Sequence, residues 1–255
     1  MVNVLNIALY NKDIPSAVNL VIQDSLNNNK FNHCVSATGA HGIIEAHNNP
    51  SFKAVLDSFY LNLPDGMPTV WIGKLKGATQ MKRCYGPDFF LALMQQSALL
   101  PIKHFFCGGK EGVADDLKAE CANRCNNKNV VGTYSPPFTV MTDDELMELA
   151  KKINQLAIDI IWVGLSTPKQ EYFAKRLAKY VHVSFIITVG AAFDFHTGRV
   201  RQAPKWVQNA GLEWFFRLLI EPKRLYKRYF TIVPQFIWLN FKEFVEFCAP
   251  KKRVL

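Results

Sequence analysis

The chain has 255 residues, and its 49% hydrophobic content suits a large buried core and excludes an intrinsically disordered protein. Its 14 glycines and 13 prolines exclude collagen-like and low-complexity classes, and no run of about 18 uncharged apolar residues predicts a membrane-spanning helix. The formal net charge is +9, and no basic segment before an apolar stretch predicts a secretory signal. We therefore expect a soluble or peripherally attached α/β protein.

Short β-branched runs alternate with longer helical patterns along the first 198 residues. The predicted strands span residues 4–10, 33–37, 59–63, 102–107, 130–132, 158–163 and 183–189. The predicted helices span residues 15–27, 42–47, 67–75, 87–99, 112–123, 143–155 and 168–179. Thr142 is a good N-cap, because three acidic residues follow it in the first turn of a helix. The alternation predicts parallel βαβ units and a Rossmann-like open parallel sheet.

Residues 199–255 differ from the rest of the chain in charge and in aromatic content. They hold twelve basic and four acidic residues, a net charge of +8, whereas residues 1–198 carry +1. Interleaved basic and aromatic residues on a helix are typical of an element that lies in a membrane interface. Packing of such helices on the core is the alternative, and no nucleic-acid-binding signature accompanies the charge. We expect a core of residues 1–198 and a helical appendage of residues 199–255, with an anionic membrane surface as partner and no nucleic acid.

Four predicted strands are followed by turns that suit a ligand site. The turns span residues 64–66, 108–109, 164–171 and 190–194. Ligands of open α/β sheets bind outside the carboxyl ends of the strands, where glycines permit close approach and helix N-termini offer N–H groups to phosphate. Each turn alone is consistent with an ordinary connection. Four turns at one edge predict a nucleotide-like ligand.

Asp65 follows an apolar run directly and has two interpretations. Its carboxylate can act as a general base at the mouth of a sheet, or it can cap the helix at 67–75, and spacing alone favours the cap. The cysteines and histidines fit no metal-binding spacing, and Cys121 and Cys125, one helical turn apart, are interpreted as reduced thiols. We expect neither a metal nor a cofactor.

A larger set of segments resembles one known family in residue type, order and spacing. The matching segments are residues 64–67 (Pro-Asp-Gly-Met), 163–165, 168–171 (Pro-Lys-Gln-Glu), 189–194 (Val-Gly-Ala-Ala-Phe-Asp), Gly198, Arg201, 203–204, 211–214 (Gly-Leu-Glu-Trp), Arg217, 221–222, Arg224 and 228–229. Together they resemble the WecG/TagA/CpsF glycosyltransferases, glycosyltransferase family 26, over roughly residues 5 to 230. Members commonly show a Thr-x-Asn-like segment after the second strand, where this chain has Thr38-Gly39-Ala40.

The resemblance implies transfer of a sugar, often N-acetylmannosamine or its uronic acid, from a UDP-sugar. The implied acceptor is a polyprenyl-diphosphate-linked sugar at the cytoplasmic face of the membrane, in the synthesis of cell-surface polysaccharide. Asp65 matches the catalytic base. The implied donor-binding residues are Thr38, Gly108, Gly109, Gly164, Pro168, Gln170, Glu171, Gly190 and Asp194. The implied phosphate- or acceptor-binding residues are Arg201, Arg217, Arg224 and Arg228, with Lys227 an alternative to the last.

The residues are consistent with that chemistry. Charge develops on the β-phosphate as UDP leaves, and the chain lacks the Asp-x-Asp motif that holds a metal in many glycosyltransferases. Arginines can neutralise the leaving group instead, which favours metal-free transfer by single displacement with inversion. Arg217, Arg224 and Arg228 are spaced seven and four residues apart, so a continuous helix places them on one face.

Two other classes of function remain as alternatives. A Rossmann-type oxidoreductase needs a glycine-rich fingerprint followed about 20 residues later by an acidic residue, and the chain has none. A non-catalytic membrane- or nucleic-acid-binding module accounts for the basic tail but leaves Asp65 and residues 168–171 unexplained. Whether the protein forms a homo-oligomer stays open.

Overall fold

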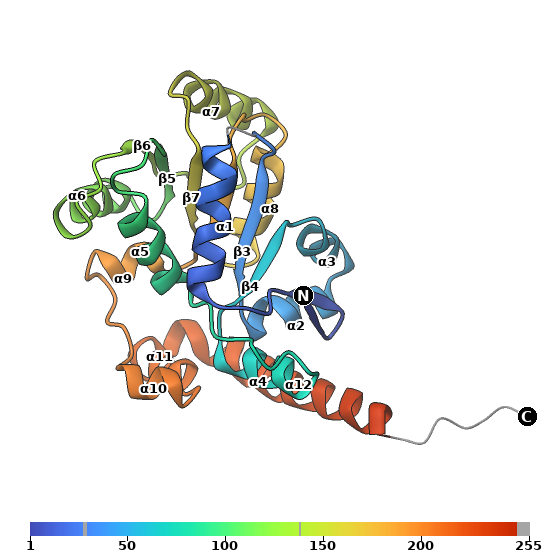
Figure 1. The fold of residues 1–255 in the computed structure, drawn as a ribbon. Coiled ribbons are helices and arrows are strands. Elements are labelled where there is room, and N and C mark those ends of the chain that lie inside the picture. The colour runs from blue at the N-terminus through green and yellow to red at the C-terminus, as the bar shows by residue number, and fades with distance from the viewer. Residues whose placement is uncertain (28–29, 138, 249–255) are drawn as a thin grey trace, which may run out of the picture.

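Six strands form one sheet through the middle of the computed structural model, which describes residues 1–27, 30–137 and 139–248 (Figure 1). The strands are β3 (His33–Thr38), β4 (Leu61–Pro64), β5 (His104–Gly108), β6 (Val130–Tyr134), β7 (Ile160–Gly164) and β8 (Phe185–Thr188). Their order is β4-β3-β8-β7-β5-β6, and all neighbouring pairs are parallel. Every residue of β5, β7 and β8 is buried, because helices cover both faces. The expected Rossmann-like α/β fold is confirmed.

The two faces of the sheet carry different helices (Figure 1). One face carries α1 (Ile14–Leu26), α5 (Gly86–Gln96), α6 (Val113–Arg124) and α9 (Ala192–His196), and the other carries α7 (Asp143–Gln155) and α8 (Lys169–Leu177). Successive residues of a strand point to opposite faces, so Trp162 packs in the first cluster and Ile161 in the second. Two apolar clusters therefore hold the sheet rigid from both sides.

Capping residues fix several helix boundaries. The Thr142 hydroxyl accepts a hydrogen bond from the Glu145 N–H (3.2 Å), and the Glu145 carboxylate accepts one from the Thr142 N–H (2.6 Å). This reciprocal pair is a capping box, and it confirms Thr142 as the predicted N-cap of α7. The bounds of α7 and of α4 (Met67–Leu75) match the prediction.

Two helices of the core, α3 (Pro50–Asp57) and α9, escaped the sequence analysis. The predicted segment 42–47 lies within α2 (Ala40–Asn48), and α3 follows it. The Asn49 side chain caps α3 by accepting hydrogen bonds from the N–H groups of Ser51 (3.1 Å) and Phe52 (3.3 Å). An Asn before a Pro at the first helical position was the signal that could have revealed α3.

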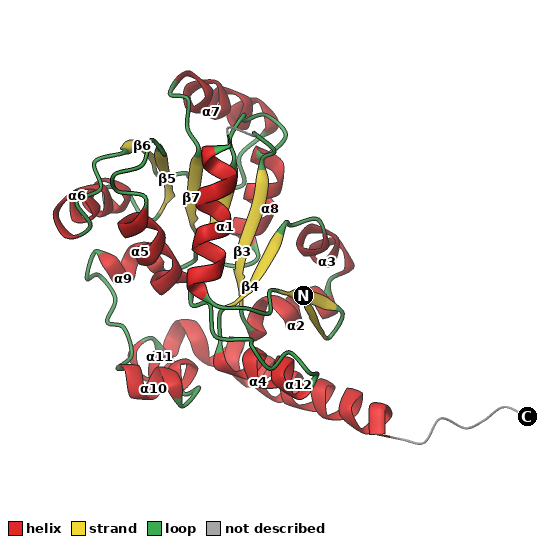
Figure 2. Cartoon of the chain, viewed as in Figure 1, coloured by secondary structure: helices red, strands yellow, loops and turns green. Residues whose placement is uncertain are grey.

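The predicted strand at 4–10 is wrong. Residues 2–9 form an antiparallel hairpin of β1 (Val2–Val4) and β2 (Ile7–Leu9), separate from the main sheet (Figure 2). Leu5 and Asn6 make its two-residue turn with φ angles of 48° and 62°. A two-residue hairpin with both φ angles positive matches the right-handed twist of its strands. Asn suits that conformation but Leu does not, so the turn was not visible as a Gly- or Asp-rich signal.

The described part of the C-terminal segment, residues 199–248, forms three helices below the carboxyl ends of the strands (Figure 1). They are α10 (Lys205–Asn209), α11 (Glu213–Ile220) and α12 (Pro222–Cys248). Ile232 and Phe236 of α12 are buried in a third apolar cluster with residues of the hairpin, α2, α3 and α4. The side-chain amides of Gln235 and Asn48 exchange two hydrogen bonds (2.7 and 3.1 Å) across the same contact. The basic, aromatic segment is thus helical and packs on the core, while its independence as a domain stays a prediction.

Candidate active site

A cavity of about 1610 Å³ lies outside the carboxyl ends of the parallel strands. Its walls come from the turns after β3, β4, β5, β7 and β8, and α4, α11 and α12 close it from below. Asp65, Gly109, Gly164, Gln170, Gly190, Asp194, Arg217, Arg224 and Arg228 all line it. The sheet therefore brings most of the sequence-predicted site residues to one place, at the edge where open α/β folds bind ligands.

Asp65 does not cap α4. The N-cap is Gly66, which makes no side-chain capping bond, and the Asp65 carboxylate instead accepts a hydrogen bond from the Gly86 N–H (2.7 Å). Burial raises the pKa of Asp65 to about 6, against the lowering effect of the nearby Arg83 guanidinium. A buried carboxylate with a raised pKa is a stronger base than one in water and is suited to accepting a proton.

Arg83 and Tyr85 link the Asp65 loop to α11, and neither was predicted as a site residue. The Arg83 guanidinium donates to the Asp65 carbonyl oxygen (2.5 Å), to the Gln208 side chain (3.2 Å) and to the Glu213 carboxylate. The Tyr85 hydroxyl donates to the other oxygen of Glu213 (2.7 Å), and the Arg83 guanidinium lies 3.9 Å from the Tyr85 ring centroid. Their partners are distant in sequence, so no local pattern could have revealed this cluster.

The expectation of one continuous helix for the three arginines is wrong. Arg217 lies on α11, whereas Arg224 and Arg228 lie one turn apart on α12. Glu221 separates the helices with non-helical angles (φ −125°, ψ 54°), and Pro222 starts the second helix with the fixed φ that suits this position. The three side chains converge on the cavity because the chain turns there, and Lys227 does not line it.

These arginines give the cavity a positive lining. Arg217 lines the cavity, and its Nε is buried and makes no hydrogen bond with any described residue. Burial lowers the pKa of Arg228, and the neighbouring charges of Arg224 and Arg217 lower it further. Arg228 is thus a partly desolvated cation among like charges, which an anion entering the cavity would stabilise.

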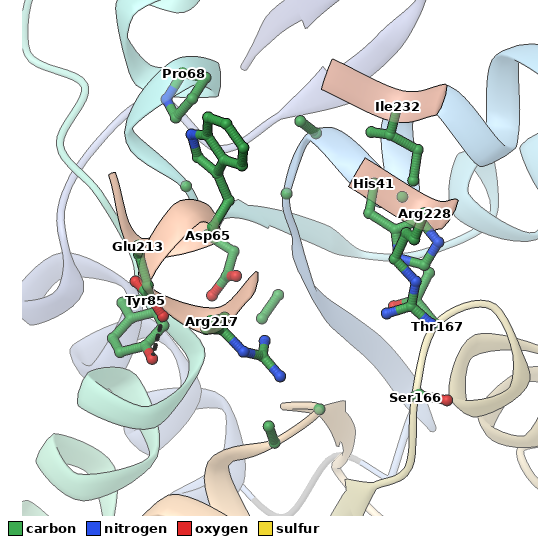
Figure 3. Close-up of a pocket in the computed structure, with 18 of the residues that line it drawn as sticks. His41, Asp65, Pro68, Tyr85, Ser166, Thr167, Glu213, Arg217, Arg228 and Ile232 are labelled. Carbon is green, nitrogen blue, oxygen red and sulfur yellow. Dashed lines mark hydrogen bonds between the residues drawn. The ribbon is translucent and has the colours of Figure 1, made fainter. Parts of the chain in front are cut away.

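His41 is a second residue that the sequence analysis missed. It lies at the start of α2 and lines the cavity, and in the view of Figure 3 it appears beside Arg228, with Ser166 and Thr167 near. Burial, together with the nearby charge of Arg228, lowers the pKa of His41 to about 4. The imidazole is therefore neutral at pH 7 and can both donate and accept a hydrogen bond.

Gln170 and Glu171 belong to a buried polar network under the cavity. The Gln170 side chain accepts a hydrogen bond from the Gly190 N–H (3.0 Å) and donates one to Glu171 (2.8 Å). The same Glu171 oxygen accepts from the hydroxyl of Ser36 (3.1 Å), which itself accepts from Thr38 (3.0 Å). Gln170 lines the cavity, whereas Glu171 and Thr38 are buried behind it. This network joins the end of β3, the first turn of α8 and the turn after β8 beneath the cavity.

Two predicted glycines have packing roles. A Cβ on Gly108 would approach the Gly164 backbone to 2.5 Å, and a Cβ on Gly164 would approach the Phe193 ring to 2.6 Å. Gly108 does not line the cavity, and Gly164 does. The absence of side chains here lets β5, β7 and α9 pack closely at the cavity edge.

The remaining predicted residues divide between the cavity and the surface. Asp194 lines the cavity, where burial raises its pKa against the opposing charge of Arg224. Pro168 is the N-cap of α8 and lies outside the lining, and Arg201 is exposed and also outside it.

The part of the chain that the structure describes shows neither a metal-binding cluster nor a membrane-spanning helix. Across residues 1–27, 30–137 and 139–248, no group of three or more His, Cys, Asp or Glu side chains is placed to hold a metal ion. Among the described helices, none combines the length and the apolar character needed to cross a membrane.

Comparison with known protein families gives a match that spans nearly the whole chain. The sequence model described as the glycosyl transferase WecG/TagA/CpsF family matches residues 2–248. The match includes the sheet, every turn that lines the cavity, and helices α10 to α12. The protein that builds this arginine-lined cavity around Asp65 therefore belongs to the WecG/TagA/CpsF family of glycosyltransferases.

Proposed function

We propose that this transferase moves a sugar of the N-acetylmannosamine type from a UDP-sugar to a polyprenyl-diphosphate-linked acceptor. The observation that carries the proposal is the cavity that joins a half-buried carboxylate, Asp65, to the three arginines Arg217, Arg224 and Arg228. A proton acceptor and a cationic site for a leaving diphosphate are the two groups that such a transfer needs.

The proposed reaction is a single displacement. The acceptor hydroxyl attacks the anomeric carbon of the donor, and the bond from that carbon to the β-phosphate oxygen breaks. Asp65 accepts the hydroxyl proton, and UDP leaves with the bonding electron pair. Attack opposite the leaving group inverts the anomeric configuration. With its pKa at about 6, Asp65 is mostly ionised at pH 7 and is still a better base than a solvated aspartate.

The arginines have the role of counter-charge in this proposal. Negative charge grows on the β-phosphate as its bond to the sugar breaks, and guanidinium groups bind phosphate oxygens through two parallel hydrogen bonds. Arg217 lines the cavity, and Arg228 is partly desolvated among like charges. This concentration of positive charge favours a diphosphate over a neutral ligand. The proposal needs no metal ion.

An apolar rim supports a lipid-linked acceptor. Trp71 and Leu75 of α4 and Ile237 and Phe241 of α12 line the cavity, and their side chains are 45%, 71%, 64% and 58% exposed. An acceptor diphosphate can reach the arginines while its polyprenyl chain lies along this rim. The exposed aromatic side chains of α12 suit the headgroup region of a membrane, so we propose peripheral attachment at the cytoplasmic face.

The test is UDP release from a panel of UDP-sugars, with and without a lipid-diphosphate-linked sugar. We expect release that needs both substrates and is fastest with UDP-N-acetylmannosamine or its uronic acid. UDP-N-acetylglucosamine, the epimer at one carbon, is the matched control for donor selectivity. Hydrolysis of the donor with water as the sole acceptor would contradict the proposal. Transfer from a sugar donor that carries a nucleotide other than UDP would also contradict it.

A further inference from the structure

A largely buried cluster in the wall of the cavity joins α11 to the loop that holds Asp65. Arg83 and Tyr85 come from the loop before α5, and both bind the carboxylate of Glu213, the first residue of α11. The side chains of Arg83 and Glu213 are each 14% exposed. A charge pair this well buried is specific in geometry, because removal of one partner leaves the other charge desolvated.

Glu213 also determines what Arg83 does to the catalytic base. Arg83 binds the main-chain oxygen of Asp65 (2.5 Å), while the Asp65 carboxylate binds the Gly86 N–H. The terminal nitrogens of Arg83 are directed to Glu213 and Gln208. Glu213 thus pairs with the Arg83 guanidinium. Without Glu213, this guanidinium would pair with the Asp65 carboxylate and make Asp65 a weaker base.

The same contact places a ligand-binding arginine. Glu213 and Arg217 are four residues apart on α11 and therefore lie on the same side of the helix. In the view of Figure 3, Glu213 meets Tyr85 at one side of the cavity, and the Arg217 guanidinium extends toward the interior near Asp65. Because α11 is anchored at Glu213, the Arg217 side chain is held near the Asp65 carboxylate.

From this juxtaposition we propose that Glu213 is a positioning residue for glycosyl transfer. The contacts of Glu213 with Arg83 and Tyr85 have two effects. They keep Arg83 away from the Asp65 carboxylate, and they position Arg217 in the proposed leaving-group site. The inference rests on the proposed function for its kinetic consequence, and on the structure alone for the docking. It makes α11 the element that joins the Asp65 loop to the arginines of the cavity.

The contact of Glu213 with Arg83 can be tested through its effect on the pKa of Asp65. The titratable and charged groups that face Asp65 are Arg83, Cys84 and Tyr85 from the loop before α5, and Glu213 and Arg217 from α11. Glu213 raises the pKa of Asp65, and Arg83 and Arg217 lower it. Glu213→Gln removes the negative charge and should shift the acid limb of the kcat/KM profile to lower pH.

Tyr85→Phe is the matched control, because it removes one hydrogen bond of the docking and leaves every charge in place. We expect Glu213→Gln to lower kcat about 10- to 100-fold, the scale of a catalytic group displaced by roughly 1 Å, and to move the acid limb. Tyr85→Phe should lower kcat less than Glu213→Gln does, and the acid limb of its kcat/KM profile should stay at the wild-type pH. Glu213→Asp, which keeps the charge, should keep the wild-type limb.

A measurement without substrate separates this inference from the proposed function. Hydrogen exchange of residues 213–220 in the ligand-free full chain should accelerate in Glu213→Gln. Infrared titration of the Asp65 carboxyl band, assigned with Asp65→Asn, should show the shift to lower pH directly. Wild-type exchange and titration in Glu213→Gln would overturn the inference, even if the enzyme transfers sugar. If no UDP-sugar supports transfer, while Glu213→Gln shows both the faster exchange and the shifted titration, only the proposed function is overturned.

Discussion

Asp65→Asn should abolish most of the activity while it raises the stability of the protein. The amide is nearly the same size as the carboxylate, and its oxygen can still accept the hydrogen bond from the Gly86 N–H. The variant cannot accept the proton of the acceptor hydroxyl. We expect turnover to fall by about 10²- to 10⁴-fold, the usual scale for loss of a general base, with binding of UDP largely retained.

The stability change follows from the raised pKa of the same group. The pKa of Asp65 rises from 3.8 to about 6 on folding, so the folded state holds the proton more tightly than the unfolded chain. A tenfold change in proton affinity corresponds to about 1.4 kcal/mol, so the ionised form costs the native state roughly 3 kcal/mol above pH 6. This cost is absent below pH 3.8 and develops as the pH rises to 6. Asp65→Asn should then stabilise the protein by up to about 3 kcal/mol at pH 7.5 and by almost nothing near pH 4.

Two assays on the same preparations test both expectations. UDP release measures turnover, and urea unfolding at pH 7.5 and pH 4 measures the free energy of unfolding. In the wild-type enzyme, kcat/KM should fall about tenfold for each pH unit below 6, as the base becomes protonated. Turnover of the variant within a few-fold of wild type would refute the role of Asp65 as base. A variant less stable than wild type at pH 7.5 would refute the account of its burial.

Three further outcomes follow from the cavity and its rim. Activity should survive EDTA, and complete loss that Mn²⁺ or Mg²⁺ restores would show that the arginines are not the main counter-charge. Arg224→Ala should impair transfer while vesicle binding is mostly kept, because one charge near an anionic surface is worth about 1 kcal/mol; equal loss of both would contradict this. Phe230→Ser and Trp238→Ser remove side chains that are 74% and 63% exposed and lie outside the cavity lining. Each should weaken vesicle binding about tenfold with turnover on a short-chain acceptor unchanged, and unchanged binding would refute attachment through α12.

The sheet could be predicted from the sequence because its strands are local patterns. Runs such as residues 158–163 and 183–189 are apolar, β-branched and bounded by turns, so they predict buried parallel strands, and β7 and β8 largely coincide with them. The hairpin at residues 2–9 shows the limit of this reasoning. Its turn places Leu5 at a positive φ that no residue pattern announces, so one apolar run was assigned as one strand.

The residues of the candidate site also fall into those that the sequence could predict and those that it could not. Asp65 could be placed at the cavity from its position after a strand, and Arg217, Arg224 and Arg228 from the family resemblance. The network behind Gln170 and the cluster around Glu213 could not, because the contacts of Glu171 with Ser36 and of Glu213 with Arg83 join segments more than a hundred residues apart. The break before Pro222 is an intermediate case, since the proline was visible and the convergence of α11 and α12 on one cavity was not.

The third apolar cluster has a consequence for how the protein is made. Val4 and Ile7 of the N-terminal hairpin share that cluster with Ile232 and Phe236 of the last helix, and Val70 of α4 also belongs to it. At the usual 5 to 20 residues per second, a ribosome needs roughly 10 to 45 s to travel from the first group to the last. During that time the nascent chain holds an apolar surface for which no partner has yet been synthesised. The helix that covers this surface also brings Arg224 and Arg228 to the cavity, so the lining of the cavity is completed only after these residues have been synthesised.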